Sequence, residues 1–131
     1  MNTILIIDDD SLYQMLLKKV IRKIDGMLNI ISHHNGEDGL LYLKECIATN
    51  SEIPDMILLD INMPVIDGWQ FLEEFDTIKS GLTKKINIYM ISSSLDENDN
   101  QRASTNHNVT GFLIKPISSL ILGNAIKESV S

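Results

Sequence analysis

The chain alternates short apolar runs with longer segments of mixed polarity. Three runs are almost continuously apolar, and two are shorter; in order along the chain they are 3–7 (TILII), 29–32 (NIIS), 56–60 (MILLD), 86–92 (INIYMIS) and 112–114 (FLI). Continuous apolar runs of this length are typical of strands that are buried on both faces of a parallel sheet. We therefore predict five strands.

The segments between these runs have helical patterns. In the first, apolar residues recur at four-residue spacing from Leu12 to Ile24 and stop before Gly26, which predicts a helix that buries Leu12, Leu16, Val20 and Ile24. Three more helices are predicted from the apolar positions Leu40, Leu43 and Ile47 within 37–48; Trp69, Leu72 and Phe75; and Leu120, Ile121, Ala125 and Ile126. The polar segment 95–108 predicts only a short helix with a thin apolar stripe.

Strands that alternate with helices indicate an α/β fold, in which right-handed crossovers build a parallel sheet. The length of 131 residues fits one domain, residues 1–131, with a core of its own. The sequence contains no internal repeat, low-complexity tract or linker that would divide it.

Four of the predicted strands end in a polar or charged side chain. Asp8 and Asp9 follow the first strand, and Asp60, Ser92 and Lys115 end the third, fourth and fifth. Ligands of open α/β sheets bind at the carboxyl ends of the strands, so these groups should meet at one site. Three carboxylates attract a hard cation such as Mg²⁺, and a lysine suits phosphate oxygens. The set predicts Mg²⁺-dependent phosphorylation of an aspartate, although spacing alone does not select which one.

Two nearby aspartates have a local explanation. Asp10 stands beside Ser11 at the start of the first predicted helix, where its side chain can accept a backbone N–H. Asp67 precedes Gly68 at the start of another helix, which is a common turn and cap sequence. We therefore interpret both as structural residues and exclude them from the site.

Charge and composition exclude several other classes of protein. The net charge is −7, aromatic residues make up 5%, and no basic cluster is present that could follow a nucleic-acid backbone. Cys46 is the sole cysteine, which rules out an internal disulfide, and we expect it to be a packing residue. The sequence shows neither a membrane span nor a signal segment, so we expect a cytoplasmic protein.

Four stretches carry a specific resemblance: ILIIDDD, MILLDINMPVIDGWQF, IYMISS and GFLIKP. They resemble, in the same order, the signature stretches of bacterial response-regulator receiver domains, and they span nearly the whole chain. The resemblance implies a flavodoxin-like sheet of order 2-1-3-4-5 with helices on both faces. It also implies a stand-alone receiver without an output domain, similar to a chemotaxis regulator.

The resemblance implies a role for each acidic residue of the site. Asp60 would accept a phosphoryl group from a sensor histidine kinase or a histidine phosphotransfer protein. Asp8, Asp9, Asp60 and the backbone carbonyl of Asn62 would hold Mg²⁺ or Mn²⁺, with Asp8 bound largely through water. The only chemistry would be self-catalysed phosphorylation and dephosphorylation, so the chain would not be a conventional enzyme.

The remaining site residues would couple the phosphoryl group to a partner. By the same resemblance, Lys115 would pair with the phosphoryl group, Ser92 would hydrogen-bond it, and a cis peptide bond would precede Pro116. Ser92 and Phe112 would act as the switch, changing the face of the fourth helix, fifth strand and fifth helix for a downstream protein or onward phosphorelay. The protein would be a monomer or a weak phosphorylation-dependent dimer.

Two other functions stay open from the residues alone. A pseudo-receiver would use the same fold as a scaffold without accepting phosphate, although the intact acidic set argues against it. A haloacid-dehalogenase-type phosphatase would use the D-x-D spacing of Asp8 and Asp10, with Asp8 as nucleophile, but Leu12 does not fit that motif. The residue that is phosphorylated distinguishes the three functions. It would be Asp60 in a receiver and Asp8 in a phosphatase, and a pseudo-receiver would not be phosphorylated.

Overall fold

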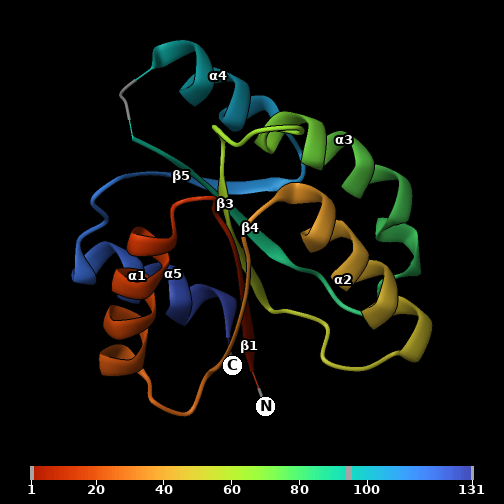
Figure 1. Cartoon of the computed structure of the whole chain (residues 1–131), viewed down its shortest axis with the longest axis horizontal. Helices are drawn as coiled ribbons and strands as arrows, with labels where there is room; N and C mark the ends of the chain where they lie inside the picture. Colours follow the sequence, from red (N-terminus) through yellow and green to blue (C-terminus); the bar gives the residue numbers. More distant parts are fainter. Residues whose placement is uncertain (1, 94–95, 131) are drawn as a thin grey trace.

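The computed structural model describes residues 2–93 and 96–130, in which five strands alternate with five α-helices (Figure 1). Their bounds are β1 Thr3–Ile7, α1 Ser11–Ile24, β2 Asn29–His33, α2 Gly36–Thr49, β3 Met56–Asp60, α3 Gly68–Ile78, β4 Asn87–Ser92, α4 Glu97–Thr105, β5 Val109–Ile114 and α5 Ser119–Ser129, with a 3₁₀ turn η1 at Lys79–Gly81. None of the helices in this part of the chain has the length and hydrophobicity needed to span a membrane.

The five strands form one parallel sheet in the order β2-β1-β3-β4-β5, as predicted. Helices α1 and α5 lie on one face of the sheet, and α2, α3 and α4 lie on the other (Figure 1). Because every strand runs the same way, all five carboxyl ends lie at one edge. The predicted α/β fold, with helices on both faces of a parallel sheet, is therefore confirmed.

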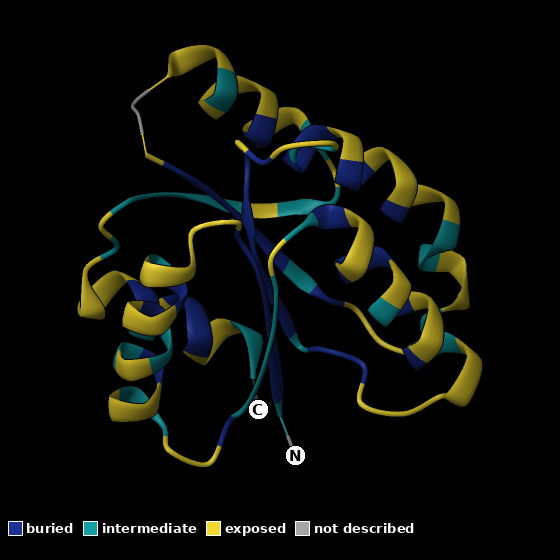
Figure 2. Cartoon of the chain, in the orientation of Figure 1, coloured by how far each residue is buried: buried dark blue, intermediate teal, exposed yellow. Residues whose placement is uncertain are grey.

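The central strands are apolar because both of their faces are covered. Every residue of β1 and β3 is buried, whereas the edge strands β2 and β5 are mostly half-buried (Figure 2). Alternate residues of β1 enter the two halves of the core, with Leu5 and Ile7 facing α2 and α3, and Ile4 and Ile6 facing α1 and α5. Each fully buried aliphatic side chain contributes about 1.5–3 kcal/mol, which fixes the direction and register of the strand that ends in the site.

The buried face of α1 differs from the predicted one. Leu12 is 77% exposed and Leu16 is 51% exposed, whereas Gln14, Leu17 and Ile21 are buried. Residues at a strict spacing of four advance by about 40° at each step, so such a row leaves the core-facing side. Alternating steps of three and four, as from 14 to 17 to 21, stay on one face.

The last strand and helix also depart from their predicted patterns. Strand β5 begins at Val109 rather than at Phe112, because Val109 and Gly111 pair with Ile88 and Tyr89 of β4, across a register shift at Thr110. In α5, Leu120 is 74% exposed and Ile121 is 51% exposed, whereas Leu122, Ala125 and Ile126 are buried.

Helix α4 is short and lightly packed, as its composition predicts. Ala103 is its only buried residue, and Leu95, at the start of the predicted segment, lies outside the described residues. Trp69 of α3 holds α4 in place, because its indole N–H donates to Asp99 at 3.3 Å and the Arg102 guanidinium lies 4.5 Å from the ring centroid. One aromatic side chain of α3 therefore contacts two residues of α4.

Candidate functional site

The structure brings four of the predicted site residues, Asp8, Asp9, Asp60 and Lys115, together at the carboxyl edge of the sheet. One carboxylate oxygen from each of Asp8, Asp9 and Asp60 lies within 4.8 Å of the other two. The Lys115 Nζ atom lies 2.9 Å from Asp8 Oδ2 and 3.8 Å from Asp60 Oδ2. Asp8 and Asp60 are buried, and Asp9 is exposed, so the cluster opens to solvent on one side.

Asp8 is held by the backbone of both neighbouring elements. Its N–H donates to the His33 carbonyl at 3.1 Å, and its Oδ1 accepts the Asp10 N–H at 2.9 Å. The buried Gln14 amide donates to the carbonyls of Asp8 at 2.7 Å and His33 at 2.8 Å. Helix α1 thereby joins the ends of β1 and β2 beneath the carboxylates.

The three consecutive aspartates have separate positions and partners. Asp8 points into the core and pairs with Lys115, whereas Asp9 lies at the exposed side of the cluster. Asp10 caps α1, with its Oδ1 accepting the Tyr13 N–H at 3.1 Å. The prediction that Asp10 is a cap is confirmed. Asp8 and Asp9 stay close together, and the Lys115 ammonium offsets part of their repulsion.

The loop after β3 holds Asp60 close to the start of α3. The Gly68 N–H donates to the Ile61 carbonyl at 2.8 Å. A Cβ at position 68 would lie 3.0 Å from both the Asp60 carbonyl oxygen and the Ile61 Cα, so glycine permits this close approach. Asp67 then forms a capping box with Gln70, which confirms its predicted structural role.

Ser92 and Lys115 are joined through the backbone. The Lys115 N–H donates to the Ser92 carbonyl at 2.8 Å, which extends the pairing of β4 with β5 by one bond. Ser92 is completely buried at the end of β4. The Lys115–Pro116 peptide bond is cis, as the resemblance implied.

The carboxylate cluster alters the proton affinity of Asp60. Burial, followed by the negative charge of Asp8, raises the pKa of Asp60 to about 7, although Lys115 opposes this rise. For Lys115, burial lowers the pKa, but the hydrogen bond to Asp8 and the charge of Asp60 outweigh it and raise the pKa above its usual value. Lys115 is therefore a stable cation, and a second cation would favour the ionised form of Asp60.

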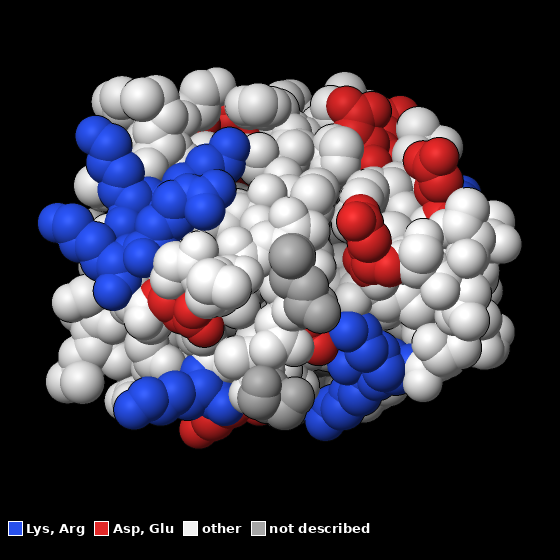
Figure 3. Space-filling model, turned by 90° about the horizontal axis from the view of Figure 1, so that it is seen from below, with Lys and Arg blue, Asp and Glu red and all other residues white. Residues whose placement is uncertain are grey.

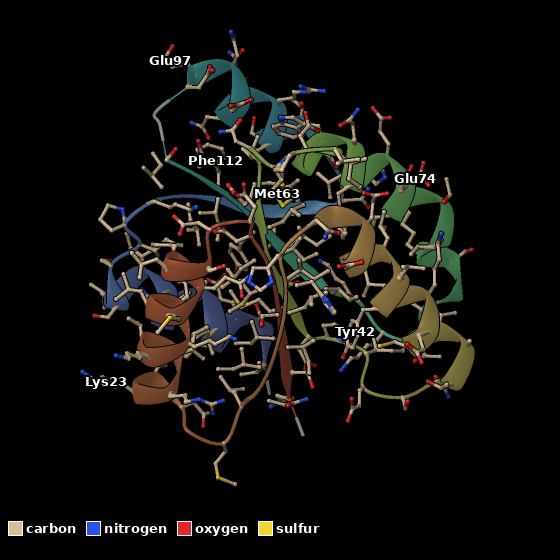
Figure 4. The ribbon with its side chains drawn as sticks, viewed as in Figure 1. Lys23, Tyr42, Met63, Glu74, Glu97 and Phe112 are labelled. Carbon is tan, nitrogen blue, oxygen red and sulfur yellow. The ribbon has the colours of Figure 1, made fainter. Side chains whose placement is uncertain are left out.

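The two other predicted residues lie in the loop after β3 and on β5. Asn62 is exposed in the loop that follows β3 and Ile61. Phe112 is half-buried on β5 opposite Met90, and it lines a groove of about 210 Å³ between α4 and β5. Figure 4 shows Phe112 and Met63 at the upper end of the sheet, on the side of α4.

Two residues of the site were missed by the sequence patterns. Gln14 had a usable signal, since an amide three residues before Leu17 falls on the buried face of α1. Tyr13 lies over Lys115, with the Nζ atom 4.6 Å from the ring centroid, and its hydroxyl accepts the Ile117 N–H at 3.1 Å. No local pattern connects Tyr13 with a loop that lies 104 residues further along the chain.

Comparison with known proteins gives one consistent family. Residues 4–127 match the response regulator receiver domain. The probable methanogenesis regulatory protein FilR2 of Methanothrix harundinacea is 28% identical over 125 residues, which cover 95% of this chain and 79% of FilR2. The sensor histidine kinase CheAY of Helicobacter pylori is 29% identical over 127 residues, which cover 97% of this chain but 15% of CheAY.

A solved structure agrees with these sequence matches. The crystal structure of a two-component response regulator from Cytophaga hutchinsonii superposes with a TM-score of 0.89 at 29% sequence identity. The match covers 98% of this chain and 96% of that one. The similarity therefore extends over the complete sheet and its helices.

Proposed function

Because the chain belongs to the response regulator receiver domain family, we propose that it is switched by phosphorylation of Asp60. The phosphoryl donor would be a phosphohistidine on a sensor histidine kinase or a histidine phosphotransfer protein. The observation that carries the proposal is the position of Asp60, which is 4% exposed, clustered with Asp8 and Asp9, and 3.8 Å from the Lys115 ammonium. A receiver is a signalling domain, so the expected chemistry is its own modification.

The acidic cluster fits a divalent cation. Its three carboxylates offer only oxygen atoms, and these lie close enough together to share one ion. Mg²⁺ and Mn²⁺ prefer such ligands and commonly keep several waters and a phosphate oxygen. We assign Asp8, Asp9, Asp60 and the backbone carbonyl of Asn62 to this ion, which when bound would offset negative charge on the phosphoryl oxygens.

The proposed transfer is a displacement at phosphorus. An Asp60 carboxylate oxygen forms a bond to phosphorus as the phosphorus–nitrogen bond of phosphohistidine breaks, and the electron pair stays on the imidazole, which takes a proton from solvent. Lys115 supplies a positive charge to the phosphoryl oxygens, and Ser92 supplies a hydroxyl donor at the neighbouring strand end. These groups act by position and charge, which is the main requirement of phosphoryl transfer.

The same phosphoryl group would change the surface of α4, β5 and α5. A new hydrogen bond would draw Ser92 toward Asp60, and the groove beside Phe112 offers space for its ring to turn inward. Phe112 has no hydroxyl, so partner recognition would depend on burial of the ring alone. The downstream target is a protein that distinguishes the phosphorylated from the unphosphorylated form of this surface.

Mass spectrometry after incubation with phosphorylated kinases or phosphotransfer proteins and Mg²⁺ tests the proposal. We expect one phosphoryl group on Asp60, loss of the modification in Asp60→Asn, and an unchanged result in Asp10→Asn. Asparagine caps a helix about as well as aspartate, so the second variant is a matched control.

Other positions for the phosphoryl group would contradict the proposal. Modification of Asp8 would instead indicate the phosphatase hypothesis. A folded protein that binds Mg²⁺ but is modified by neither these donors nor acetyl phosphate would indicate a pseudo-receiver.

A further inference from the structure

We infer that Tyr13 is a positioning residue for Lys115, and that its aromatic ring keeps the ammonium within reach of Asp60. Its expected effect on phosphorylation rests on the proposed function, whereas the contact itself does not. Tyr13 is in the first turn of α1, and Lys115 directly follows β5, so the contact joins two elements at the carboxyl edge of the sheet.

The first observation is the position of the ammonium over the ring. Lys115 Nζ lies 4.6 Å from the Tyr13 ring centroid, within the distance of about 6 Å at which a cation is attracted to an aromatic face. Both side chains are half-buried, which strengthens this attraction relative to an exposed pair. The ring therefore contributes a third contact to Lys115, in addition to those with Asp8 and Asp60.

The second observation concerns the loop that carries Lys115. The Tyr13 hydroxyl accepts the Ile117 N–H at 3.1 Å, so one side chain contacts both the ammonium and the backbone two residues later. Burial, opposed by this hydrogen bond, raises the pKa of Tyr13 above its usual value. The phenol therefore stays neutral at physiological pH, and the ring attracts the cation without adding a charge to the site.

The nature of the contact suits a lysine that must exchange partners. Lys115 is closer to Asp8, at 2.9 Å, than to Asp60, at 3.8 Å. To pair with a phosphoryl group on Asp60, the ammonium must move away from Asp8. A ring face attracts a cation with little directional preference, so it restrains Lys115 near the site during this movement. A hydrogen-bonding partner in the same place would compete with the phosphoryl oxygens.

The contact can be tested without any phosphorylation. Ammonium groups over a ring face experience a ring current, so the Lys115 Hζ and Cε protons should resonate upfield of those of the exposed lysines in NMR spectra at low pH and temperature. The shift should persist in Tyr13→Phe and disappear in Tyr13→Leu. Normal Lys115 shifts in the wild-type protein would overturn the inference, even if Tyr13→Leu failed to fold.

The functional consequence is measured with acetyl phosphate and Mg²⁺. We expect Tyr13→Leu to be phosphorylated about tenfold more slowly, since a partly desolvated cation–π contact has about this effect on an equilibrium or a rate. Tyr13→Phe should keep the rate within about threefold, while the Ile117 amide exchanges faster because its acceptor is gone. The Mg²⁺ affinity of both variants should stay within about twofold of the wild type, because the carboxylates are intact.

The matched control is Tyr42→Leu. Tyr42 is also half-buried with a hydroxyl bonded to backbone, but it lies on α2, across the sheet from α1 (Figure 4). The Tyr42→Leu protein should be phosphorylated on Asp60 at the wild-type rate. A wild-type rate in folded Tyr13→Leu, or an equal loss in Tyr13→Phe and Tyr13→Leu, would overturn the inference. Absence of phosphorylation in the wild-type protein would refute the proposed function but leave the NMR result to decide on the contact.

Discussion

At the residue scale, Asp60 combines burial with a neighbouring negative charge. Both effects disfavour its ionised form and raise its pKa to about 7, so near neutral pH the metal-free protein holds this carboxyl partly protonated. The same burial keeps most water away from the Asp60 oxygens. A carboxyl group that is poorly stabilised as an anion gains most from a cation or from covalent neutralisation of one oxygen.

Replacing Asp60 by Asn should therefore change how stability depends on pH. Without metal, the folded state retains a proton that the unfolded state loses above pH about 4, so stability falls as pH rises from about 4 to about 7. Asp60→Asn should lack this decline and be more stable than wild type at pH 8 by about 1–3 kcal/mol. Urea unfolding in EDTA at pH 5 and pH 8 measures the difference. If the free energy of unfolding changed equally with pH in both proteins, the raised pKa of Asp60 could not be the cause of the decline.

At the scale of elements, the sequence patterns predicted the features that neighbouring residues determine, namely buried strands and helix starts. The continuous apolar runs of β1 and β3 identified buried strands, and Asp10 and Asp67 identified helix starts. The apolar residues predicted for α1 and α5 are only partly buried, because both helices contain more apolar residues than one face can bury; Leu12 and Leu120 are exposed, whereas Ala125 and Ile126 are buried. Periodicity cannot select between two apolar rows; contact with the sheet does.

Trp69 gives an element-scale prediction about α4. In Trp69→Phe the indole N–H to Asp99 is lost and the surface beneath Arg102 shrinks. Amides of α4 should then exchange about fivefold faster, since one hydrogen bond is worth about 1 kcal/mol. Hydrogen exchange followed by mass spectrometry tests this, with the amides of β1 as an internal control. Unchanged exchange in α4 would show that Ala103 and the backbone suffice to hold it.

At the scale of the whole molecule, acidic and basic side chains gather in different places. The acidic cluster lies at the carboxyl edge of the sheet, whereas α1 carries four of the chain's 11 Lys and Arg residues, Lys18, Lys19, Arg22 and Lys23. Figure 3 shows basic side chains gathered on the side where α1 lies, seen from the opposite edge. Convergence of the acidic groups was predictable because parallel strands end together, but the strand order came from family resemblance, since no local pattern encodes it.

Metal binding should stabilise the whole molecule in a pH-dependent way. Mg²⁺ at ten times its dissociation constant adds about 1.4 kcal/mol, which corresponds to a rise of about 4 °C in melting temperature. The rise should be larger at pH 8 than at pH 5, because protons compete for Asp60, whose pKa is about 7. Calorimetry with MgCl₂, with NaCl at equal ionic strength as control, measures this. An equal rise at both pH values would exclude Asp60 as a ligand.

The sparse packing of α4 has a consequence for how strongly a signal must act. A helix with one buried residue has few contacts to lose, so its alternative positions differ little in free energy. To invert a ratio of ten to one between two such positions, a ligand or modification must favour the minor one by about 2.7 kcal/mol. A few charge-assisted hydrogen bonds to one phosphoryl group are enough. A more deeply packed α4 would leave the same phosphoryl group bound but without effect on the surface.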